Sequence, residues 1–270
     1  MASEDLERLR HNLDVLRLRN MAEHLDTHLR EAQRLALGHV GLLARVTDAE
    51  VLARREQGAQ QRISRACFEE VLTLDGYDFK QQPSIDRRQI IDLAELGFLD
   101  RCEAVLLMGP SGVGKSHLAT ALGVKACENG YRVEYHRGPD LLPILHTAQA
   151  DESLDELLEA LVKPQLLILD ELGAGPRKPD QDFGALFYEL VGARHRRGAI
   201  IVVSNFRPTE WAQKLGNAPL VTAAVDRLLD GAHVISVPED APSYRANRKR
   251  GAGKLPPRRL PASVRRYRRR

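Results

Sequence analysis

The sequence predicts an α/β protein in which a five-stranded parallel sheet is flanked by helices and follows a small all-α domain. Two observations lead to this prediction. In the first seventy residues, apolar side chains recur at helical intervals, as in Leu6, Leu9 and Leu13. After residue 103, short runs rich in Val, Ile and Leu alternate with helical stretches. This alternation is typical of parallel strands joined by right-handed helical crossovers.

Each strand is predicted from one apolar run. The five runs are residues 104–108, 131–136, 165–170, 199–204 and 233–237. The helix before the second run is expected to end at Gly130, because glycine readily adopts the left-handed conformation that ends many helices. Arg194, Arg196 and Arg197 come at the end of the helix before the fourth run, where cations offset the helix dipole.

The helical region and a linker precede the sheet. Residues 1–75 are predicted to form an N-terminal domain that binds DNA or a partner protein, and residues 76–103 a linker. In the linker, Pro83 and Ser84 suit the start of a helix over residues 85–99.

The N-terminal domain is expected to end in a long charged helix from Thr47 to Val71. Its narrow apolar stripe consists of Val51, Leu52, Ile63 and Cys67.

Composition favours a globular protein of a reducing compartment. Of the 270 residues, 43% are hydrophobic and 29% charged, so wholesale disorder is not expected. No apolar run approaches the roughly 18 to 20 residues of a membrane-spanning helix, and the first ten residues are acidic and polar where a signal peptide would be basic and apolar. The three cysteines show no CxxC spacing. The predicted location is the cytoplasm, without a membrane partner.

Charge is distributed unevenly along the chain. Of the 40 Lys and Arg residues, twelve lie in residues 241–270, which contain no acidic residue. Residues 1–240 contain the other 28 together with all 37 acidic residues, so their net charge is −9. The end of the chain, residues 251–270, is predicted to be a disordered basic tail. The twelve positive charges of residues 241–270, with Tyr244 and Tyr267 interleaved, suit sequence-independent contacts to DNA phosphates, and a solubilising terminus is the alternative.

A glycine-rich loop follows the first predicted strand and opens a helix. Its sequence, GPSGVGKS, satisfies GxxxxGK[ST], in which backbone N–H groups converge on phosphate oxygens. In this pattern Lys115 binds the β- and γ-phosphates and Ser116 ligates Mg²⁺. The predicted ATP-binding residues are Gly109, Pro110, Ser111, Gly112, Val113, Gly114, Lys115, Ser116 and His117.

The third predicted strand ends in two carboxylates, within LLILDE. Burying a carboxylate without a partner costs several kcal/mol, so a buried pair of carboxylates requires a bound cation or water. Asp170 is therefore predicted to hold Mg²⁺ together with Ser116, and Glu171 to orient or deprotonate the attacking water. A water-activating carboxylate favours ATP hydrolysis over phosphoryl transfer to a metabolite. The run at 131–136, which comes between the loop strand and this one, agrees with the ATPase branch that inserts a strand there.

The fourth predicted strand ends at Asn205. Because ligand groups come from the carboxyl ends of parallel strands, Asn205 can reach the γ-phosphate or the lytic water; an Asn in this setting is otherwise often a turn former.

From residue 1 to about 250 the chain resembles the AAA+ ATPases, and among them the IstB-like transposition helpers related to DnaC-type helicase loaders. The resemblance is carried by GPSGVGKSHLATALGVKACENGYRV, LLILDELG, LFYELVGARHRRGAIIVVSN, AAVDRLLDGAHVISV and SYR. Upstream, DFKQQPSIDRRQIIDLA resembles the linker of those helpers. The resemblance implies an ATPase domain over residues 104–250.

It also implies roles for three residues. Asn205 matches the sensor 1 position, Arg227 the arginine finger that reaches a neighbouring subunit's γ-phosphate, and Arg245 a sensor 2-like position. Without the resemblance, Arg227 would be read as a solvated arginine on a helix face. A finger acts only when subunits dock, so the resemblance implies a homo-oligomer with ATP sites between subunits.

The predicted function is that of an ATP-dependent transposition helper. ATP binding would drive assembly on duplex DNA, the assembly would recruit or stimulate the transposase encoded by the same element, and hydrolysis would disperse it. Three alternatives remain at this point: a loader of a replicative helicase, a phosphotransferase acting on a small molecule, and a DNA-binding scaffold with a vestigial ATP site.

Overall fold

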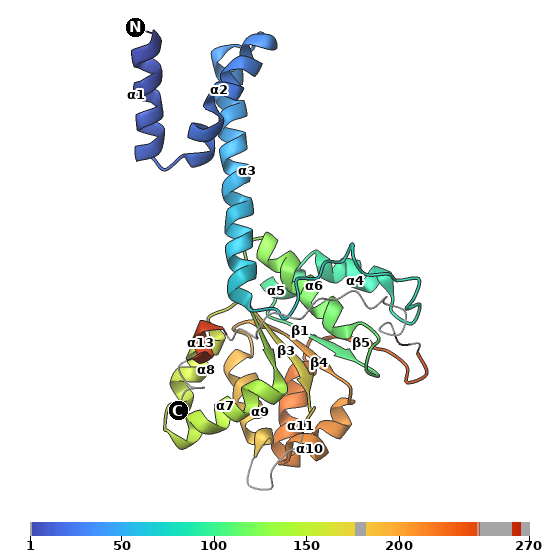
Figure 1. The fold of residues 1–270 in the computed structure, drawn as a ribbon. Coiled ribbons are helices and arrows are strands. Elements are labelled where there is room, and N and C mark those ends of the chain that lie inside the picture. The colour runs from blue at the N-terminus through green and yellow to red at the C-terminus, as the bar shows by residue number, and fades with distance from the viewer. Residues whose placement is uncertain (1, 176–181, 242, 244–260, 266–270) are drawn as a thin grey trace. The chain divides into compact units, whose positions relative to one another are not determined.

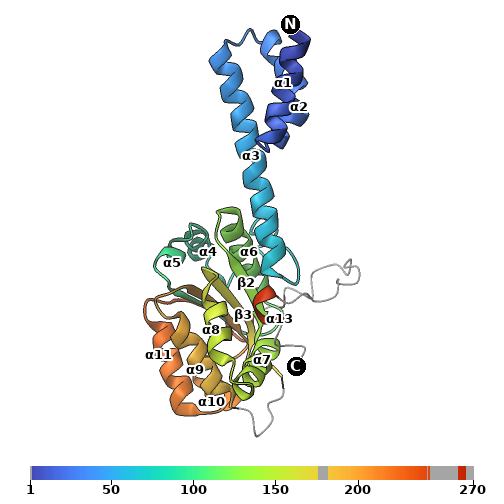
Figure 2. The ribbon, with the colours of Figure 1, turned by 90° about the vertical axis from the view of Figure 1, so that its left-hand side faces the viewer.

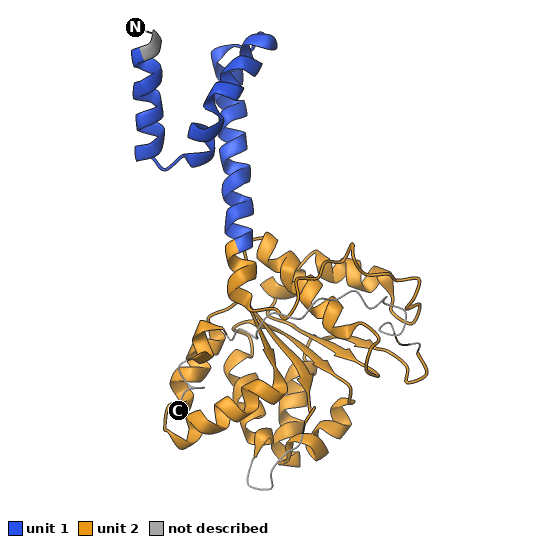
Figure 3. Ribbon diagram, viewed as in Figure 1, with its two compact units in different colours: residues 1–60 blue, residues 61–270 orange. Residues whose placement is uncertain are grey.

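The computed structural model describes residues 2–175, 182–241, 243 and 261–265 (Figure 1). The chain divides into two compact units, residues 1–60 and 61–270, coloured blue and orange in Figure 3. The sequence places the end of the helical domain later, at residue 75. The division falls earlier because Ile63 and Ala66 are buried in the core of the second unit. None of the helices among the described residues combines the length and apolar character that a membrane crossing requires.

Unit 1 is built from three helices. They are α1 (Ala2–Val15), α2 (Arg19–Arg34) and the greater part of α3 (His39–Ala66). Leu13, Leu25, Ala32 and Val46 are buried and supply a small core. The predicted apolar stripe on the long helix is wrong in part. Val51 and Leu52 are largely exposed, whereas Ile63 is buried in the core of unit 2, so the same helix serves two environments.

A buried carboxylate joins α3 to the start of α2. Glu50 accepts hydrogen bonds from the backbone N–H of Met21 (3.0 Å) and from Nε of Arg54 (2.8 Å), and Arg54 also donates to the carbonyl of Arg17. Burial raises the pKa of Glu50, but the hydrogen bonds from Arg54 and Met21 outweigh it, so the net pKa is lowered from the ordinary value of 4.5.

Glu50→Gln should destabilise unit 1 above pH 4.5 by about 1 kcal/mol, the usual effect of losing a charged partner at a helix N-terminus. Because the folded-state pKa is lowered, the contribution of Glu50 is present above the unfolded-state value and is lost as pH falls through the folded-state value. The difference between variant and wild type should therefore shrink in acid. Helix melting followed by circular dichroism from pH 3 to 8 measures this. The exposed Glu56→Gln is the control, and a pH-independent difference would contradict the assignment.

Unit 2 contains the predicted parallel sheet. Its strands are β1 (Ala104–Met108), β2 (Val133–Arg137), β3 (Leu166–Leu172), β4 (Ala199–Ser204) and β5 (His233–Ser236), in the spatial order β2-β3-β4-β1-β5. All the pairings are parallel. The five strands are confirmed, but the inserted strand is not the one expected. β4 lies between β1 and β3, and β2, the run at 131–136, forms an edge.

Helices cover both faces of the sheet (Figure 1). The helices of this unit that pack on it are α4 (Arg87–Ala94), α5 (Gly97–Asp100), α6 (Lys115–Glu128), α7 (Gly138–Ala150), α8 (Leu154–Val162), α9 (Phe183–Arg194), α10 (Pro208–Leu215) and α11 (Ala218–Leu229). α4, α5 and α6 share one core with Val105 and Leu107 of β1, and α7 to α11 share the other with Leu106. Neighbouring residues of a strand point to opposite faces, so an apolar run without alternation feeds both cores.

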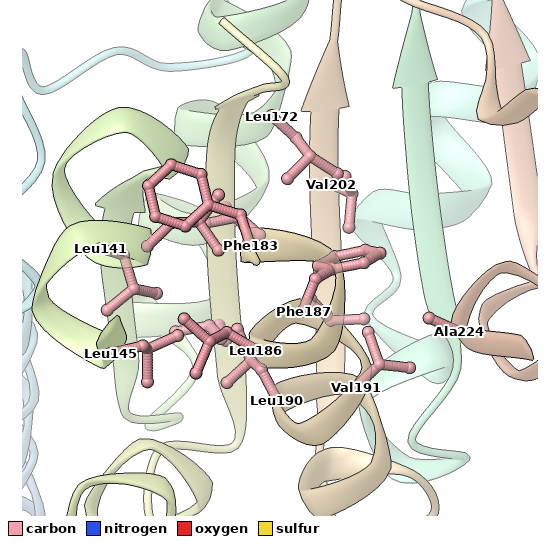
Figure 4. Close-up of a cluster of buried hydrophobic side chains, with 14 of the residues drawn as sticks. Leu141, Leu145, Leu172, Phe183, Leu186, Phe187, Leu190, Val191, Val202 and Ala224 are labelled. Carbon is pink, nitrogen blue, oxygen red and sulfur yellow. The ribbon is translucent and has the colours of Figure 1, made fainter. Parts of the chain in front are cut away.

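The second of these cores is centred on α9 (Figure 4). Phe187 and Val191 of α9 lie beside Val202 of β4 and Ala224 of α11, and Leu141 of α7 is near Phe183. α9 is thus packed between neighbouring helices and the sheet, which fixes its position relative to the strands.

Of two local predictions in this unit, one needs revision and one is confirmed. The single helix predicted for residues 85–99 is two helices, α4 and α5, because Leu96 adopts the left-handed conformation (φ 65°) between them. The helix α6 ends as predicted before Gly130, whose φ is 96°.

Part of the basic tail is ordered. Residues 262–265 form a short helix, α13 (Ala262–Arg265), next to α8 (Figure 2). Val264 is fully buried in the α9 core, and the Ser263 hydroxyl donates to Glu134 Oε2 at 2.6 Å. The sequence predicts disorder for these residues because the composition of the tail as a whole is basic and poor in apolar residues. The single apolar contact of Val264 is not visible in that composition. Apart from Pro261, the rest of the tail lies outside the described residues.

Arg194 ends its helix, as the sequence predicts, but its side chain is buried and has a further role. It is 1% exposed, and its guanidinium donates to the carbonyls of Leu161, Pro164 and Ala199, the last at 2.6 Å. Burial lowers its pKa to about 10. Arg194 therefore satisfies carbonyls between the end of α8 and the start of β3, where backbone acceptors would otherwise be buried without a donor.

Candidate nucleotide-binding site

The glycine-rich loop connects β1 to α6, as predicted. Gly109, Gly112 and Gly114 have φ values of 139°, 84° and 95°, a conformation that L side chains rarely adopt. At Gly114, a Cβ atom would also lie 2.6 Å from the ring of Tyr77. The first backbone hydrogen bond of α6 runs from Leu118 N–H to the Gly114 carbonyl, so the N–H groups before it are at the helix N-terminus, which attracts anions.

The linker packs against this loop. Tyr77 donates its hydroxyl to the carbonyl of Val113 (3.1 Å), and Gln82 is fully buried beside the same carbonyl. His117, predicted to bind ATP, has its ring 5.1 Å from that of Tyr77 and its Nε2 2.9 Å from the carbonyl oxygen of Thr73. The His117 side chain thus contacts Tyr77 and Thr73, so its predicted contact with ATP would be made by its backbone N–H.

Lys115 is held in place within the loop. Its side chain is 5% exposed, and Nζ donates to the carbonyls of Gly109 and Pro110 (both 2.7 Å) and to Oδ1 of Asn205 (2.9 Å). Asn205 comes from the end of β4, the neighbour of β1. The structure therefore brings the two residues together, at the carboxyl edge of the sheet where a γ-phosphate would be recognised.

Asp170 is a buried acceptor beside the loop. It is 2% exposed; Oδ2 accepts from the hydroxyl of Tyr135 (2.6 Å), Oδ1 accepts from the N–H of Glu171 (2.7 Å), and the Ser116 hydroxyl also donates to the carboxylate. Burial raises the pKa of Asp170, and these hydrogen bonds offset the rise only in part. Asp170 and Ser116, the two predicted metal ligands, are thus adjacent.

Glu171 lies on an irregular part of β3. Leu169 pairs with Val202 and Leu172 with Ser204, so β3 has one residue more than β4 between these pairs, and Glu171 has a φ of 55°. Such a bulge re-aims side chains near functional sites. Here the bulge follows Asp170, whose carboxylate accepts from Ser116, while the next residue, Glu171, is directed to Arg137.

The carboxylate of Glu171 forms an ion pair with Arg137, at the end of the edge strand β2. Arg137 Nε donates to Glu171 Oε2 at 2.8 Å, Nη2 contacts the same oxygen, and Glu69 lies 3.7 Å from Arg137. Sequence reasoning missed Arg137. The signal that could have found it is its place at the end of a strand, the same rule that selected Asn205.

Arg227 lies at the opposite end of the strands, where the strands begin. It lines a cavity with Ala104 and Ile200, which are at the amino ends of β1 and β4. A strand rises about 3.3 Å per residue, so the length of β1 puts roughly 13 Å between this edge and the loop. Arg227 is not brought together with the loop of its own chain. Arg245, the other arginine predicted from the resemblance, lies outside the described residues.

The donors present suit magnesium held largely by the nucleotide. Within the described ranges, no group of three or more His, Cys, Asp or Glu residues could hold a metal ion on its own. Mg²⁺ usually takes one or two protein oxygens and completes its shell with phosphates and water. Ser116 and Asp170 provide such a pair.

A glycine loop between a strand and a helix, with Lys115 and two strand-end carboxylates beside it, is the site of a P-loop nucleotide-binding protein. The strand order, with β4 between β1 and β3, places it in the AAA+ class. The crystal structure of DnaI has this fold: it superposes with a TM-score of 0.50 at 23% sequence identity, covering 62% of this chain and 90% of that one.

The family described as "IstB-like ATP binding protein" matches residues 11–252, and the chain belongs to that family. It is 37% identical over 249 residues to a protein of Pseudomonas aeruginosa named for ATP binding and for the insertion sequence IS21, covering 91% of this chain and 92% of that protein. A corresponding protein of insertion sequence IS232 from Bacillus thuringiensis subsp. berliner is 32% identical, with coverage of 86% and 92%. The chain is therefore an ATP-binding protein associated with transposition.

Proposed function

We propose that this protein hydrolyses ATP in the service of transposition: it assembles on duplex DNA in the ATP state, recruits or stimulates the transposase of the same element, and disassembles on hydrolysis. The observation that carries this proposal is the separation of Arg227 from its own loop. Four of the predicted catalytic and binding residues lie at the carboxyl ends of the strands: Lys115, Asn205, Asp170 and Glu171. Arg227 lies at the amino ends, so a full catalytic set requires two copies of the chain. The relatives named for insertion sequences support the link to transposition.

ATP binding changes the partners of Lys115. Its ammonium exchanges two loop carbonyls for the β- and γ-phosphates, while Asn205, already 2.9 Å away, stays within reach of the γ-phosphate. Ser116 and Asp170 would hold Mg²⁺, which would neutralise charge on the phosphates.

Hydrolysis requires Glu171 to change partners. While its carboxylate oxygen accepts hydrogen bonds from Arg137, Glu171 is held by the guanidinium and is not directed at a water molecule. Release from Arg137 lets Glu171 orient and deprotonate water beside the γ-phosphate. We expect assembly to favour that release, so that turnover follows docking of a neighbour's Arg227.

Unit 1 exposes apolar side chains that suit a protein partner. Val40, Leu43 and Val51 of α3 are all exposed, Val40 by 80%, and at 100° per residue they lie on one side of the helix. Exposed apolar groups that cluster on one side mark protein contacts more often than DNA contacts. Of the two roles predicted for this region, we therefore favour binding of a partner protein. The likeness to DnaI concerns the fold and does not favour a helicase as that partner.

Electron microscopy and mass measurement of the protein on duplex DNA test the proposal. With a nonhydrolysable ATP analogue we expect a DNA-bound oligomer, which should be absent with ADP and for Arg227→Ala. The transposase encoded next to the gene should be retained by this oligomer in a pull-down. A particle of unchanged mass with and without the analogue would overturn the proposal, and phosphate transferred to a small acceptor instead of water would favour a phosphotransferase.

Deletion of residues 251–270 should flatten the salt dependence of DNA binding. Each lost phosphate contact reduces the slope of log K against log salt by about 0.9 on duplex DNA. Binding is measured by fluorescence anisotropy at several salt concentrations with the ATP analogue present. An unchanged slope would remove the tail from the DNA interface and leave it a solubilising terminus.

A further inference from the structure

The guanidinium of Arg227 rests on two residues of α9 that lie one helical turn apart. Nη2 donates to the hydroxyl of Tyr188 at 2.8 Å, and the guanidinium carbon is 4.4 Å from the centre of the Tyr188 ring. At Gly192 a Cβ atom would lie 2.7 Å from Nη1 of Arg227. Residues spaced by four share one side of a helix, so Tyr188 and Gly192 together form a surface that the guanidinium contacts. We call this pair the arginine socket.

The socket leaves the charge of Arg227 without a carboxylate. In the same cavity, of about 210 Å³, Arg101 donates to Glu103 at 2.7 Å and Arg196 lies 3.8 Å from Asp230. Among the described residues, Arg227 has only the neutral Tyr188 as its side-chain partner. An aromatic face and a hydroxyl orient a guanidinium without neutralising it, so its attraction for an external anion is retained.

Orientation matters for an arginine that acts across an interface. A long flexible side chain loses rotamer entropy when it is immobilised, and a donor that is already oriented contributes more to transition-state stabilisation because it need not reorganise. The packing of α9 between the sheet and α11 makes it a rigid base for the socket.

We propose that Tyr188 and Gly192 position Arg227 for insertion into the ATP site of a second copy of this chain. The proposal rests on the proposed function, since it requires Arg227 to act between subunits. Tyr188 and Gly192 are positioning residues: neither touches the nucleotide, and both act through Arg227.

Three variants separate positioning from a structural role. Tyr188→Phe removes the hydrogen bond and keeps the aromatic face, Tyr188→Ala removes both, and Gly192→Ala fills the space that Nη1 occupies. We expect kcat of the DNA-bound assembly to fall at least about tenfold for Tyr188→Ala and for Gly192→Ala, and less for Tyr188→Phe, with KM for ATP unchanged because the nucleotide contacts are all at the other edge. Tyr131→Phe, which loses a hydroxyl hydrogen bond to Asp100, is the control.

Gly192→Ala makes the distinction sharpest. Alanine in place of a helical glycine stabilises a helix, so the melting temperature should be maintained or raised while turnover falls. A structural role would lower both together. Wild-type kcat in Gly192→Ala and Tyr188→Ala would overturn the proposal.

Mixing subunits distinguishes a failed socket from a failed function. Glu171→Gln copies can supply Arg227 to a neighbour but cannot hydrolyse their own ATP; Tyr188→Ala copies keep a complete loop site. A mixture should turn over ATP faster than the sum of its parts, as should Arg227→Ala mixed with Glu171→Gln. Rescue of Arg227→Ala without rescue of Tyr188→Ala would refute the socket and leave the function standing. Rescue of neither would remove the finger role of Arg227 and with it the proposed function.

Discussion

Glu171→Gln should lower ATP turnover by at least about 100-fold, the usual contribution of a general base, while ATP affinity stays close to that of the wild type. The amide can still accept a hydrogen bond from water but cannot take its proton. It also loses the ion pair with Arg137, so the variant should accumulate as an ATP-bound assembly on DNA. Phosphate release, together with nucleotide content after gel filtration, measures both effects.

Arg137→Ala tests the same ion pair from the other side. Release of Glu171 should raise the basal turnover in the absence of DNA, because the carboxylate no longer has to leave a guanidinium before it can act as a base. The exposed Glu128→Gln, at the end of α6, serves as the control for both variants. Unreduced turnover in Glu171→Gln would rule out its role as the base.

The sheet and the loop site could be predicted because each depends on a short stretch of sequence. A buried parallel strand needs a continuous apolar run, and the loop needs glycines at fixed positions before Lys115, so both features are visible without knowledge of the neighbours. The topological rule that strand ends carry ligands then brought Asn205 to the site, and the structure places its Oδ1 2.9 Å from Lys115.

What could not be predicted depends on partners distant in sequence. Arg194 looks like a helix-end cation, yet it is buried because the turn before β3 presents carbonyls that need a donor. Arg227 looks like a surface arginine until α9 supplies Tyr188 and Gly192. In both cases the local sequence shows where the arginine lies on its helix. Its surroundings are created by tertiary packing, which cannot be predicted from local periodicity.

Sheet order shows the same limit. The chain passes from β1 through β2 to β3, so sequence order suggests that β2 separates the other two, whereas β4 fills that place in the sheet. The difference has a consequence for the site. With β4 beside β1, Asn205 is next to the loop, and with β2 at the edge, Arg137 reaches Glu171 from the side away from Lys115.

Lys115→Ala should raise the Kd for ATP by at least about 100-fold, since charge-assisted hydrogen bonds to phosphate contribute about 1.5 to 3 kcal/mol each and the ammonium has more than one phosphate oxygen to contact. Without nucleotide the cost is smaller, because the carbonyls of Gly109 and Pro110 lie in a partly exposed loop that water can enter. The variant should thus fold but show no rise in melting temperature with ATP, which stabilises the wild type in proportion to its binding. Lys125→Ala, an exposed lysine in the last turn of the same helix, should retain the full shift. An undiminished shift in Lys115→Ala would mean that the nucleotide is not held by this loop, and every step that links the γ-phosphate to assembly would lose its basis.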